Sequence, residues 1–486
     1  MNRRLGGAGN CLALFCLLVG TLPAFGRTPD AHAWLRLMTL QDHNTRVVLL
    51  GTLLLGCGCG VIGTFLLLRK RALVSDAVSH ATLPGIAIAF LIMAAMGGTG
   101  KHLGGLLLGG LCSGLLGMGV LTLIRAQTRL KEDAALAIVL SVFFGLGVAL
   151  LGIVQKMPQG HAAGLESFIY GKTASMLAAD AQAIALVALV VLLLCTAFFK
   201  EFTLLCFDEA FAAAQGWPVR RLDALMLLLV VIVTVIGLQA VGLILMVALL
   251  VIPPAAARFW TRRTATLLPV SATIGGISGL LGAGLSALQP RMPAGAIIVL
   301  TSACFFLFSF LFGTERGLLP RGMHQRRLRR KVGLQHLLRA MYEWLEQVYP
   351  SAMQQAVEGS PVMPWRELLA ARSWHAPFLR RLLTRARQSG WVLALPDGSI
   401  RLTRDGLVEA RRVVRNHRLW ELYLVAYADI APSHVDRDAD QVEHVLGAGM
   451  VRELERAYAR EAGMPPNPHG PAAAGSAGVR APGGAP

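Results

Sequence analysis

The sequence predicts an all-α polytopic membrane protein that carries a cytoplasmic α+β domain of the winged-helix kind. We expect about nine transmembrane helices, preceded by a signal peptide or signal anchor. Three observations predict this class. The 486 residues are 55% hydrophobic and only 15% charged, whereas charged residues make up about 25% of an ordinary soluble domain. Apolar runs of nearly the ~20 residues that span a bilayer recur between residues 47 and 312. Beyond residue 315, charged residues and helical periodicity return, with one short hairpin signal.

The N-terminal residues 1–26 have the pattern of a signal peptide or an uncleaved signal anchor. Arg3 and Arg4 precede an apolar stretch that ends near a weak small-residue cleavage site. Residues 27–45 are polar, and we expect them on the periplasmic side. The transmembrane domain is therefore expected to cover residues 46–314.

Nine apolar segments are candidates for membrane spans. They are 47–68, 77–96, 103–124, 134–154, 181–199, 222–239, 240–257, 265–288 and 294–312. The sixth and seventh form one unbroken block of about 36 residues, which at ~1.5 Å per residue is too long for a single crossing. Gly237 and Gly242 offer a place for the chain to turn, so we expect two spans there.

Lys and Arg are concentrated in alternate loops, which predicts the orientation of the spans. The basic residues gather in the odd-numbered loops and after the last span, for example Arg69, Lys70, Arg71, Arg125, Arg129, Lys131, Arg220, Arg221, Arg258, Arg262, Arg263, Arg316 and Arg321. We therefore expect these loops and the C-terminal region in the cytoplasm, and the protein in a bacterial inner membrane. The formal net charge of +18 is explained first by these loops rather than by nucleic-acid binding.

Two ionisable residues stand at the cytoplasmic start of the second predicted span. Asp76 and His80 are four residues apart, so a helix places them on nearly one face. A carboxylate and an imidazole on one face can share a divalent cation. Ionisable groups inside a span cost about 2.5–3.5 kcal/mol each and are usually paired, wetted or functional. A structural Asp–His hydrogen bond is the alternative interpretation of the pair.

Three stretches of the predicted membrane region form a recognisable set: R-K-R-A-L-V-S-D-A-V-S-H-A-T-L-P-G at 69–85, F-D-E-A-F-A-A-A-Q-G-W-P at 207–218, and L-Q-A-V-G-L-I-L-M-V-A-L-L-V-I-P-P-A-A-A at 238–257. On these stretches, residues 46–313 resemble the permease subunits of zinc, manganese and iron ABC importers, the ABC-3 family. The resemblance implies that Asp76 and His80 form the metal-translocation pair. It also implies that a divalent metal is the transported ion and that the permease needs no cofactor of its own.

The stretch 207–218 lies in the fifth loop, where Asp208 and Glu209 precede a short Ala-rich helix that ends at Gly216. The family resemblance implies that this helix docks onto a cytoplasmic ATPase subunit; a simple surface connector is the alternative. The chain contains no G-x-x-x-x-G-K-S/T motif, so we expect a transport subunit rather than an enzyme, with ATP hydrolysis on a separate polypeptide. The family further implies a periplasmic metal-binding protein and a homo- or heterodimer of permeases.

After the last span we expect a basic linker at 315–331, a domain at 332–460 and a disordered Pro/Gly/Ala-rich tail at 461–486. Within the domain, a basic helix runs to a Gly390 cap and two short strands turn at Asp397-Gly398, a strong hairpin signal. Helix followed by hairpin is typical of a winged helix. Candidate contacts with DNA phosphates are Arg380, Arg381, Arg385 and Arg387. A solvated basic face explains the same residues.

The stretches N-H-R-L-W-E-L-Y-L and D-A-D-Q-V-E-H-V-L, at 416–424 and 438–446, resemble metal-dependent repressors of the diphtheria-toxin-repressor type. The positions that match that family's metal ligands are His417, Asp440, Glu443 and His444. These ligands would suit Mn(II), Fe(II) or Zn(II). The stretch that matches the family's first helix has His336 and Arg339 instead of carboxylates. Because an arginine repels a cation, the departure puts metal binding by this domain in doubt.

The sequence therefore predicts the permease subunit of an ATP-driven importer for manganese, zinc or iron, with a repressor-like domain that senses the metal. The alternative function is a membrane-tethered, metal-responsive regulator that binds DNA. The ligand types do not distinguish the three metals.

Overall fold

The computed structural model describes residues 42–97, 102–157, 171, 173–288, 293–349, 361–371, 374–396 and 398–427. The predictions for the signal segment, the C-terminal tail and the candidate ligands Asp440, Glu443 and His444 lie outside these residues. The chain divides into two compact units, residues 1–321 and 322–486. Each unit is described by itself.

Eight helices of the first unit are long and apolar enough to cross a membrane, and each overlaps a predicted span. They are α3 (His43–Leu68), α4 (Val74–Ala95), α5 (Leu103–Gln127), α6 (Glu132–Lys156), α8 (Ala178–Ala197), α11 (Val219–Val241), α13 (Thr264–Ala287) and α14 (Ala294–Phe312). Most of α3, α4 and α11 is buried inside the unit, whereas α5, α6, α8 and α14 turn most of their apolar surface outward, as a bilayer requires. The polytopic all-α class is confirmed.

The seventh predicted span forms a shorter helix, α12 (Leu243–Ala257), of 15 residues. At ~1.5 Å per residue it is about 22 Å long, less than the ~30 Å hydrocarbon core. The break from α11 falls at Gly242, where φ is 83°, a conformation that glycine adopts freely. A Cβ on Gly237 would lie 2.1 Å from the Met246 sulfur, so the two helices pack closely across the turn that we expected between these glycines.

Loops of the same parity come together at each end of the first unit. At one end, Arg71 of the first loop contacts Asp223, which follows the fifth loop, with an Nη1–Oδ1 distance of 2.7 Å. Arg262 of the seventh loop pairs with Glu315, beyond the last span, at 2.6 Å. These contacts agree with the alternation that the basic residues predict.

At the other end, Gln239 donates a hydrogen bond of 3.0 Å to Asp180. A Cβ on Gly171 would meet the Val241 carbonyl group at 2.5 Å. These residues belong to the fourth loop and the α11–α12 turn, so the short α12 joins the two ends of the unit.

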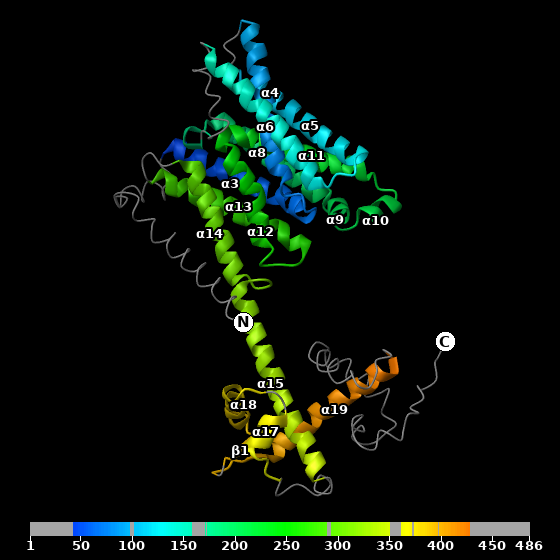
Figure 1. Cartoon of the computed structure of the whole chain (residues 1–486). Helices are drawn as coiled ribbons and strands as arrows, with labels where there is room; N and C mark the ends of the chain where they lie inside the picture. The colour runs from blue at the N-terminus through cyan, green and yellow to red at the C-terminus, as the bar shows by residue number, and fades with distance from the viewer. Residues whose placement is uncertain are drawn as a thin grey trace. The chain divides into compact units, whose positions relative to one another are not determined.

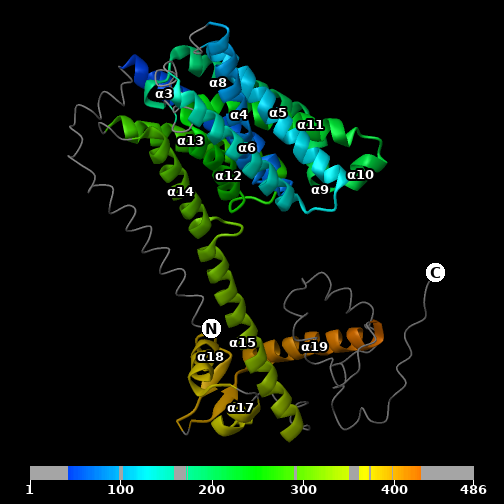
Figure 2. The same cartoon turned by 45° about the horizontal axis from the view of Figure 1, so that its top comes forward.

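Helices α3 and α13 approach closely because small residues line both. A Cβ on Gly56 would lie 2.2 Å from the carbonyl oxygen of Gly275, so neither position has room for a side chain. Between the same helices, the Ser271 hydroxyl donates to the Gly60 carbonyl at 2.8 Å. Small residues at such interfaces let membrane helices pack by van der Waals contact. Helix α4 meets α5 in the same way, and Figures 1 and 2 both show α4, α5 and α6 side by side.

The second unit contains helices around a two-stranded sheet. Its elements are α15 (Leu318–Val348, which begins within the first unit), α17 (Trp365–Ala371), α18 (Ala376–Gln388), β1 (Val392–Ala394), β2 (Ile400–Leu402) and α19 (Arg404–Tyr427). Strand β1 pairs antiparallel with β2, with Val392 opposite Leu402. Gly390 caps α18 with φ at 74°, as predicted. Met363 adds an antiparallel bridge to Ile400. The α+β class of this domain is confirmed. Residues 318–331, which we expected in a linker, are helical.

Candidate metal site and docking loop

Asp76 and His80 lie one turn apart in α4, where the first turn carries the carboxylate. The Nε2–Oδ1 distance is 3.4 Å, and the side chains are 33% and 16% exposed, respectively. This distance exceeds the ~2.7–3.2 Å of an ordinary N–H···O bond but lies within ion-pair range, so it fits both the structural and the metal-binding interpretation of the pair. The other ring nitrogen, Nδ1, is buried and has no hydrogen-bond partner among the described residues.

The surroundings of His80 hold the imidazole ring in place. Phe144 of α6 packs edge-on against the imidazole, with ring centroids 4.7 Å apart. The nearby Ser79 hydroxyl donates a hydrogen bond of 2.8 Å to the Ser75 carbonyl oxygen. Pro84 lies inside α4, and because proline has no N–H it cannot donate the usual helical bond to the His80 carbonyl. The start of α4 also places the positive end of the helix dipole near Asp76.

Among the described residues, no cluster of three or more His, Cys, Asp or Glu side chains could hold a metal ion. The pair thus offers two side-chain ligands, and the remaining positions of a bound cation would fall to water or backbone oxygens.

The loop between α8 and α11 folds into two short helices, α9 (Phe199–Phe207) and α10 (Glu209–Ala214). Asp208 caps α10, since its Oδ1 accepts a hydrogen bond of 2.9 Å from the Phe211 N–H. Gly216 ends α10 with φ at 82°, and Trp217 N–H donates back to the Ala212 carbonyl at 3.1 Å, as in a Schellman motif. The structure therefore contains the short helix expected between Glu209 and Gly216.

Three aromatic side chains stand exposed around α10, which the sequence analysis had not singled out. Phe207, Phe211 and Trp217 are 68%, 50% and 42% exposed. They lie outside the candidate membrane spans. We call Phe207, Phe211 and Trp217 the aromatic patch. Exposed apolar clusters of this kind mark interaction sites, and Figures 1 and 2 draw α9 and α10 at one end of the helix bundle.

The turn between α3 and α4 spans residues 69–73. It begins with Arg69, Lys70 and Arg71, which we call the basic turn. Its two arginine side chains are 5% and 4% exposed, respectively, although the sequence suggested ordinary loop charges. Both guanidinium groups contact Oδ1 of Asp223, at 2.9 Å and 2.7 Å. Sequence patterns could not have found this partner, which lies more than 150 positions away.

Cys206 of α9 lies beside the basic turn. Burial raises the pKa of the Cys206 thiol to about 12, even though Arg69 and Arg71 act to lower it. The thiol contacts the Phe65 carbonyl at 3.7 Å. A thiol that stays protonated at neutral pH is neither a nucleophile nor a metal ligand, so Cys206 serves packing between α9 and α3.

In the second unit, His417 is buried in α19 beside Glu421, with an Nε2–Oε1 distance of 3.1 Å and side-chain exposures of 1% and 2%. Arg339, which we expected to repel a cation, pairs with Glu343 at 2.6 Å. A further pair links Arg418 of α19 with Glu346 of α15. The sequence analysis missed these three glutamates. The described residues alone do not complete a metal site here.

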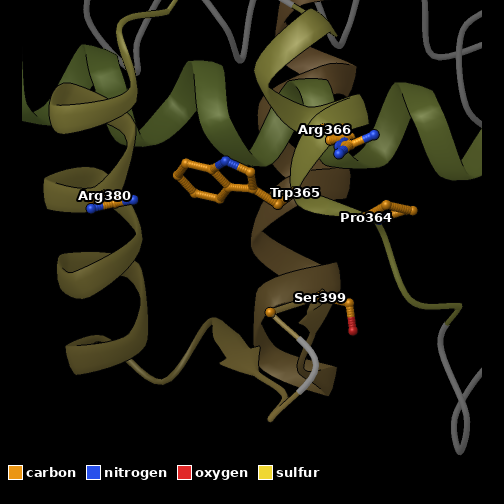
Figure 3. A pocket seen from close by; sticks show the side chains of 6 residues that line it. Pro364, Trp365, Arg366, Arg380 and Ser399 are labelled. Carbon is orange, nitrogen blue, oxygen red and sulfur yellow. The ribbon is translucent and has the colours of Figure 1, made fainter.

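The arginines of α18 face the surface, except that Arg385 is half-buried. Arg380 lies over the Trp365 ring, 6.0 Å from its centroid. A hollow of about 610 Å³ opens beside them, lined by Pro364, Trp365, Arg366, Arg380, Gly398 and Ser399. Figure 3 shows the indole extending toward Arg380, with Ser399 on the hairpin loop. The surface is basic and lies between α18 and the hairpin.

Together, the eight spans, the same-end pairing of alternate loops and the capped loop helix define a membrane permease of the ABC type. The chain belongs to the ABC 3 transport family, whose model matches residues 41–313. A second model, described as the iron dependent repressor metal binding and dimerisation domain, matches residues 403–465. That match begins after α18, and it includes His417, Asp440, Glu443 and His444.

Two relatives and one solved structure illustrate the membership. The manganese transport system membrane protein MntC of Bacillus subtilis (strain 168) is 38% identical over 406 residues, which is 83% of this chain and 89% of the relative. The zinc transport system membrane protein TroC of Treponema pallidum (strain Nichols) is 43% identical and covers 61% of this chain and 97% of its own length. The structure of PsaBC from Streptococcus pneumoniae in complex with Fab matches with a TM-score of 0.52 and 30% identity, over 61% of this chain and 99% of that chain.

Proposed function

We propose that this chain is the permease subunit of an ABC importer that carries a divalent transition metal, manganese, zinc or iron, across the inner membrane. The observation that carries the proposal is the Asp76–His80 pair, 3.4 Å apart at the start of a buried membrane helix. Relatives named for manganese and zinc transport support the choice of substrate. Asp76 and His80 are the residues through which the ion passes.

The chemistry of the pair suits transient coordination. The carboxylate and the imidazole replace part of the ion's hydration shell. The His80 carbonyl oxygen receives no helical hydrogen bond from Pro84, which has no N–H, so it is a further oxygen ligand on the same helix. Conduction needs binding strong enough for entry and weak enough for release. A pair of side chains without a third ligand meets both needs better than a closed structural site.

The decisive experiment measures metal accumulation in cells that carry Asp76→Ala or His80→Ala. We expect uptake to fall by at least the roughly 10–100-fold that a metal site loses when even an outer-shell partner is removed. Asp133→Asn is the matched control, because Asp133 is an exposed acid in the first turn of α6. Uptake with manganese, zinc or iron limiting identifies the substrate. Wild-type uptake in both alanine variants would refute the role of the pair.

The partners follow from the same proposal. A separate cytoplasmic ATPase docks on α10, with Asp208, Glu209 and Gly216 shaping the helix and the aromatic patch supplying contact area. A periplasmic metal-binding protein delivers the ion at the opposite end, and two permease chains, identical or different, form the pathway. We place α10 and the second unit in the cytoplasm because the basic loops predict that side.

The domain that we propose for residues 332–460, which lies in the second unit, is the candidate for regulation of transport by cytosolic metal. The repressor-type match over 403–465 supports a metal-responsive element, with His417 and the positions Asp440, Glu443 and His444 as its ligands. A second candidate function, DNA binding, is favoured by one observation. The exposed arginines Arg380, Arg381 and Arg387 line one helix beside a hairpin, with half-buried Arg385 between them.

A further inference from the structure

The two arginines of the basic turn share one carboxylate oxygen. Arg69 Nη2 and Arg71 Nη1 both reach Oδ1 of Asp223, and the Asp223 side chain is only 16% exposed. The two guanidinium groups have little contact with water, so solvent cannot compensate their positive charges. The Asp223 carboxylate provides that compensation. The arrangement is therefore rigid in a way that a surface ion pair is not.

The contacts of Arg69 extend to the docking loop. Its Nη1 donates to the Leu205 carbonyl of α9 at 2.7 Å, and its Nη2 lies 3.3 Å from Oε2 of Glu209, the first residue of α10. Asp223 itself belongs to the first turns of α11. One guanidinium group thus touches all three helices that surround the aromatic patch.

The contacts of Arg71 extend to the helices around the metal pair. Its Nε lies 2.6 Å from Oε1 of Glu132, the first residue of α6, and α6 supplies the Phe144 ring that packs on His80. The Arg71 carbonyl accepts a hydrogen bond of 3.0 Å from the N–H of Val74, where α4 begins. Asp76 follows two residues later, with no flexible segment in between.

The backbone of the basic turn is built to aim both side chains inward. Lys70 has φ at 60°, and among the residues that the structure describes it is the only non-glycine residue with a positive φ. Two backbone hydrogen bonds close the turn, as in a Schellman motif: the Lys70 N–H donates to the Leu67 carbonyl, and the Arg71 N–H donates to the Leu66 carbonyl. The strained residue is exposed, while its neighbours on both sides are buried. Strain that persists at one position indicates that the surroundings require it.

We propose that Arg69, Arg71, Asp223, Glu132 and Glu209, which we call the Asp223 network, are positioning residues that make α10 and the start of α4 move as one body. Movement of an ATPase at α10 then displaces the Asp76–His80 pair directly. This inference rests on the proposed import function and names the part of the chain that couples ATP hydrolysis to the ion.

The test uses the complete importer reconstituted in liposomes, with its ATPase subunit and metal-binding protein, and measures ions imported per ATP hydrolysed. In Asp223→Asn we expect ATP hydrolysis to continue while the ratio falls by roughly tenfold or more, since the shared charge is lost. Asp223→Glu, which keeps the charge, restores most of the ratio. Glu315→Gln removes the exposed Arg262–Glu315 pair at the same end and keeps the wild-type ratio.

An unchanged ratio in Asp223→Asn overturns the inference, as does a proportional fall of hydrolysis and uptake, which indicates a merely structural role. If Asp223→Asn does not accumulate in the membrane, Glu209→Gln decides the question. The Glu209 side chain is 57% exposed, and its substitution leaves the contacts of Arg69 and Arg71 with Asp223 intact. The number of ions imported per ATP should therefore fall by a smaller factor than in Asp223→Asn. If it does not fall, the inference is overturned. A wild-type importer that moves no metal overturns the proposed function itself, whereas normal transport by both Asp76→Ala and His80→Ala refutes only the role of the pair.

Discussion

At the scale of single residues, Lys70 shows how a local cost supports a distant contact. The left-handed conformation costs an L-residue roughly 1–2 kcal/mol, and glycine is the residue that usually occupies this position after a helix. Here the conformation lets the residues before and after Lys70 turn into the protein. The lysine side chain is itself exposed, which suits a cytoplasmic membrane surface.

This conformation predicts opposite effects of two substitutions. Lys70→Gly relieves the strain, so the melting temperature of the detergent-solubilised protein should stay level or rise, with metal uptake retained. Lys70→Val should lower the melting temperature, because a β-branched residue tolerates positive φ poorly. Thermal unfolding monitored by tryptophan fluorescence measures both. A glycine variant that melts as low as the valine variant would show that φ at residue 70 is not what limits stability.

At the scale of elements, helix α10 was predictable from the sequence, whereas the exposed aromatic side chains around it were not. Asp208, Glu209 and Gly216 are cap residues, and caps act within one turn of the chain, so the sequence located α10 closely. The exposure of Phe207, Phe211 and Trp217 depends on how α9 and α11 pack on α10. Apolar periodicity alone would have assigned such aromatics to a core.

The aromatic patch predicts where the ATPase binds. Phe211→Asp should weaken its association by about tenfold or more, since a buried aromatic anchor contributes at least ~2 kcal/mol to an interface. Co-purification of the ATPase with the tagged permease measures the loss. Leu177→Asp is the control, because Leu177 is 67% exposed at the opposite end of the bundle. Normal co-purification of the Phe211 variant would exclude the aromatic patch as the docking surface.

Helix α12 illustrates the limit of hydropathy. Residues 240–257 have the composition of a full span, yet the helix starts only after Gly242. Hydropathy averaged over a window does not distinguish apolar residues in a helix from apolar residues in the turn that precedes it. The backbone conformation at Gly242 decided the start of the helix, and therefore its length.

At the scale of the whole molecule, a transport unit and a repressor-like unit share one chain. The first unit belongs to a family of permeases and the second matches a metal-binding regulator domain. Under the proposed function, the second unit would let the permease sense the ion that it delivers. The buried His417–Glu421 pair lies within α19, and the Arg418–Glu346 pair links α19 with α15.

Removing the second unit tests this arrangement. We expect a chain truncated after residue 315 to accumulate more metal than the full-length protein at high external supply, and equal amounts at low supply, because the restraint is lost only when the cytosol is replete. Cellular metal content measures the effect. His417→Ala in the full chain should reproduce it if metal binding at α19 imposes the restraint.

Equal accumulation at every supply would contradict a regulatory role and direct attention to DNA. In that case the full-length protein in detergent should retard a DNA duplex in a salt-dependent manner, and substitution of Arg380 and Arg381 by alanine should abolish the shift. The absence of a shift at low salt would exclude the DNA-binding function.

The sequence by itself determined what acts over a few residues. Spans, the parity of basic loops, the shared face of Asp76 and His80, the caps at Gly216 and Gly390 and the hairpin all follow from hydropathy, charge or spacing within one turn. Only the tertiary structure brought Arg69 and Arg71 onto Asp223, closed α3 on α13 through Gly56 and Gly275, and gave Arg418 its acidic partner Glu346. Several of these contacts join residues 70 to more than 200 positions apart, where no periodicity connects them, and their geometry is set by how closely the helices pack.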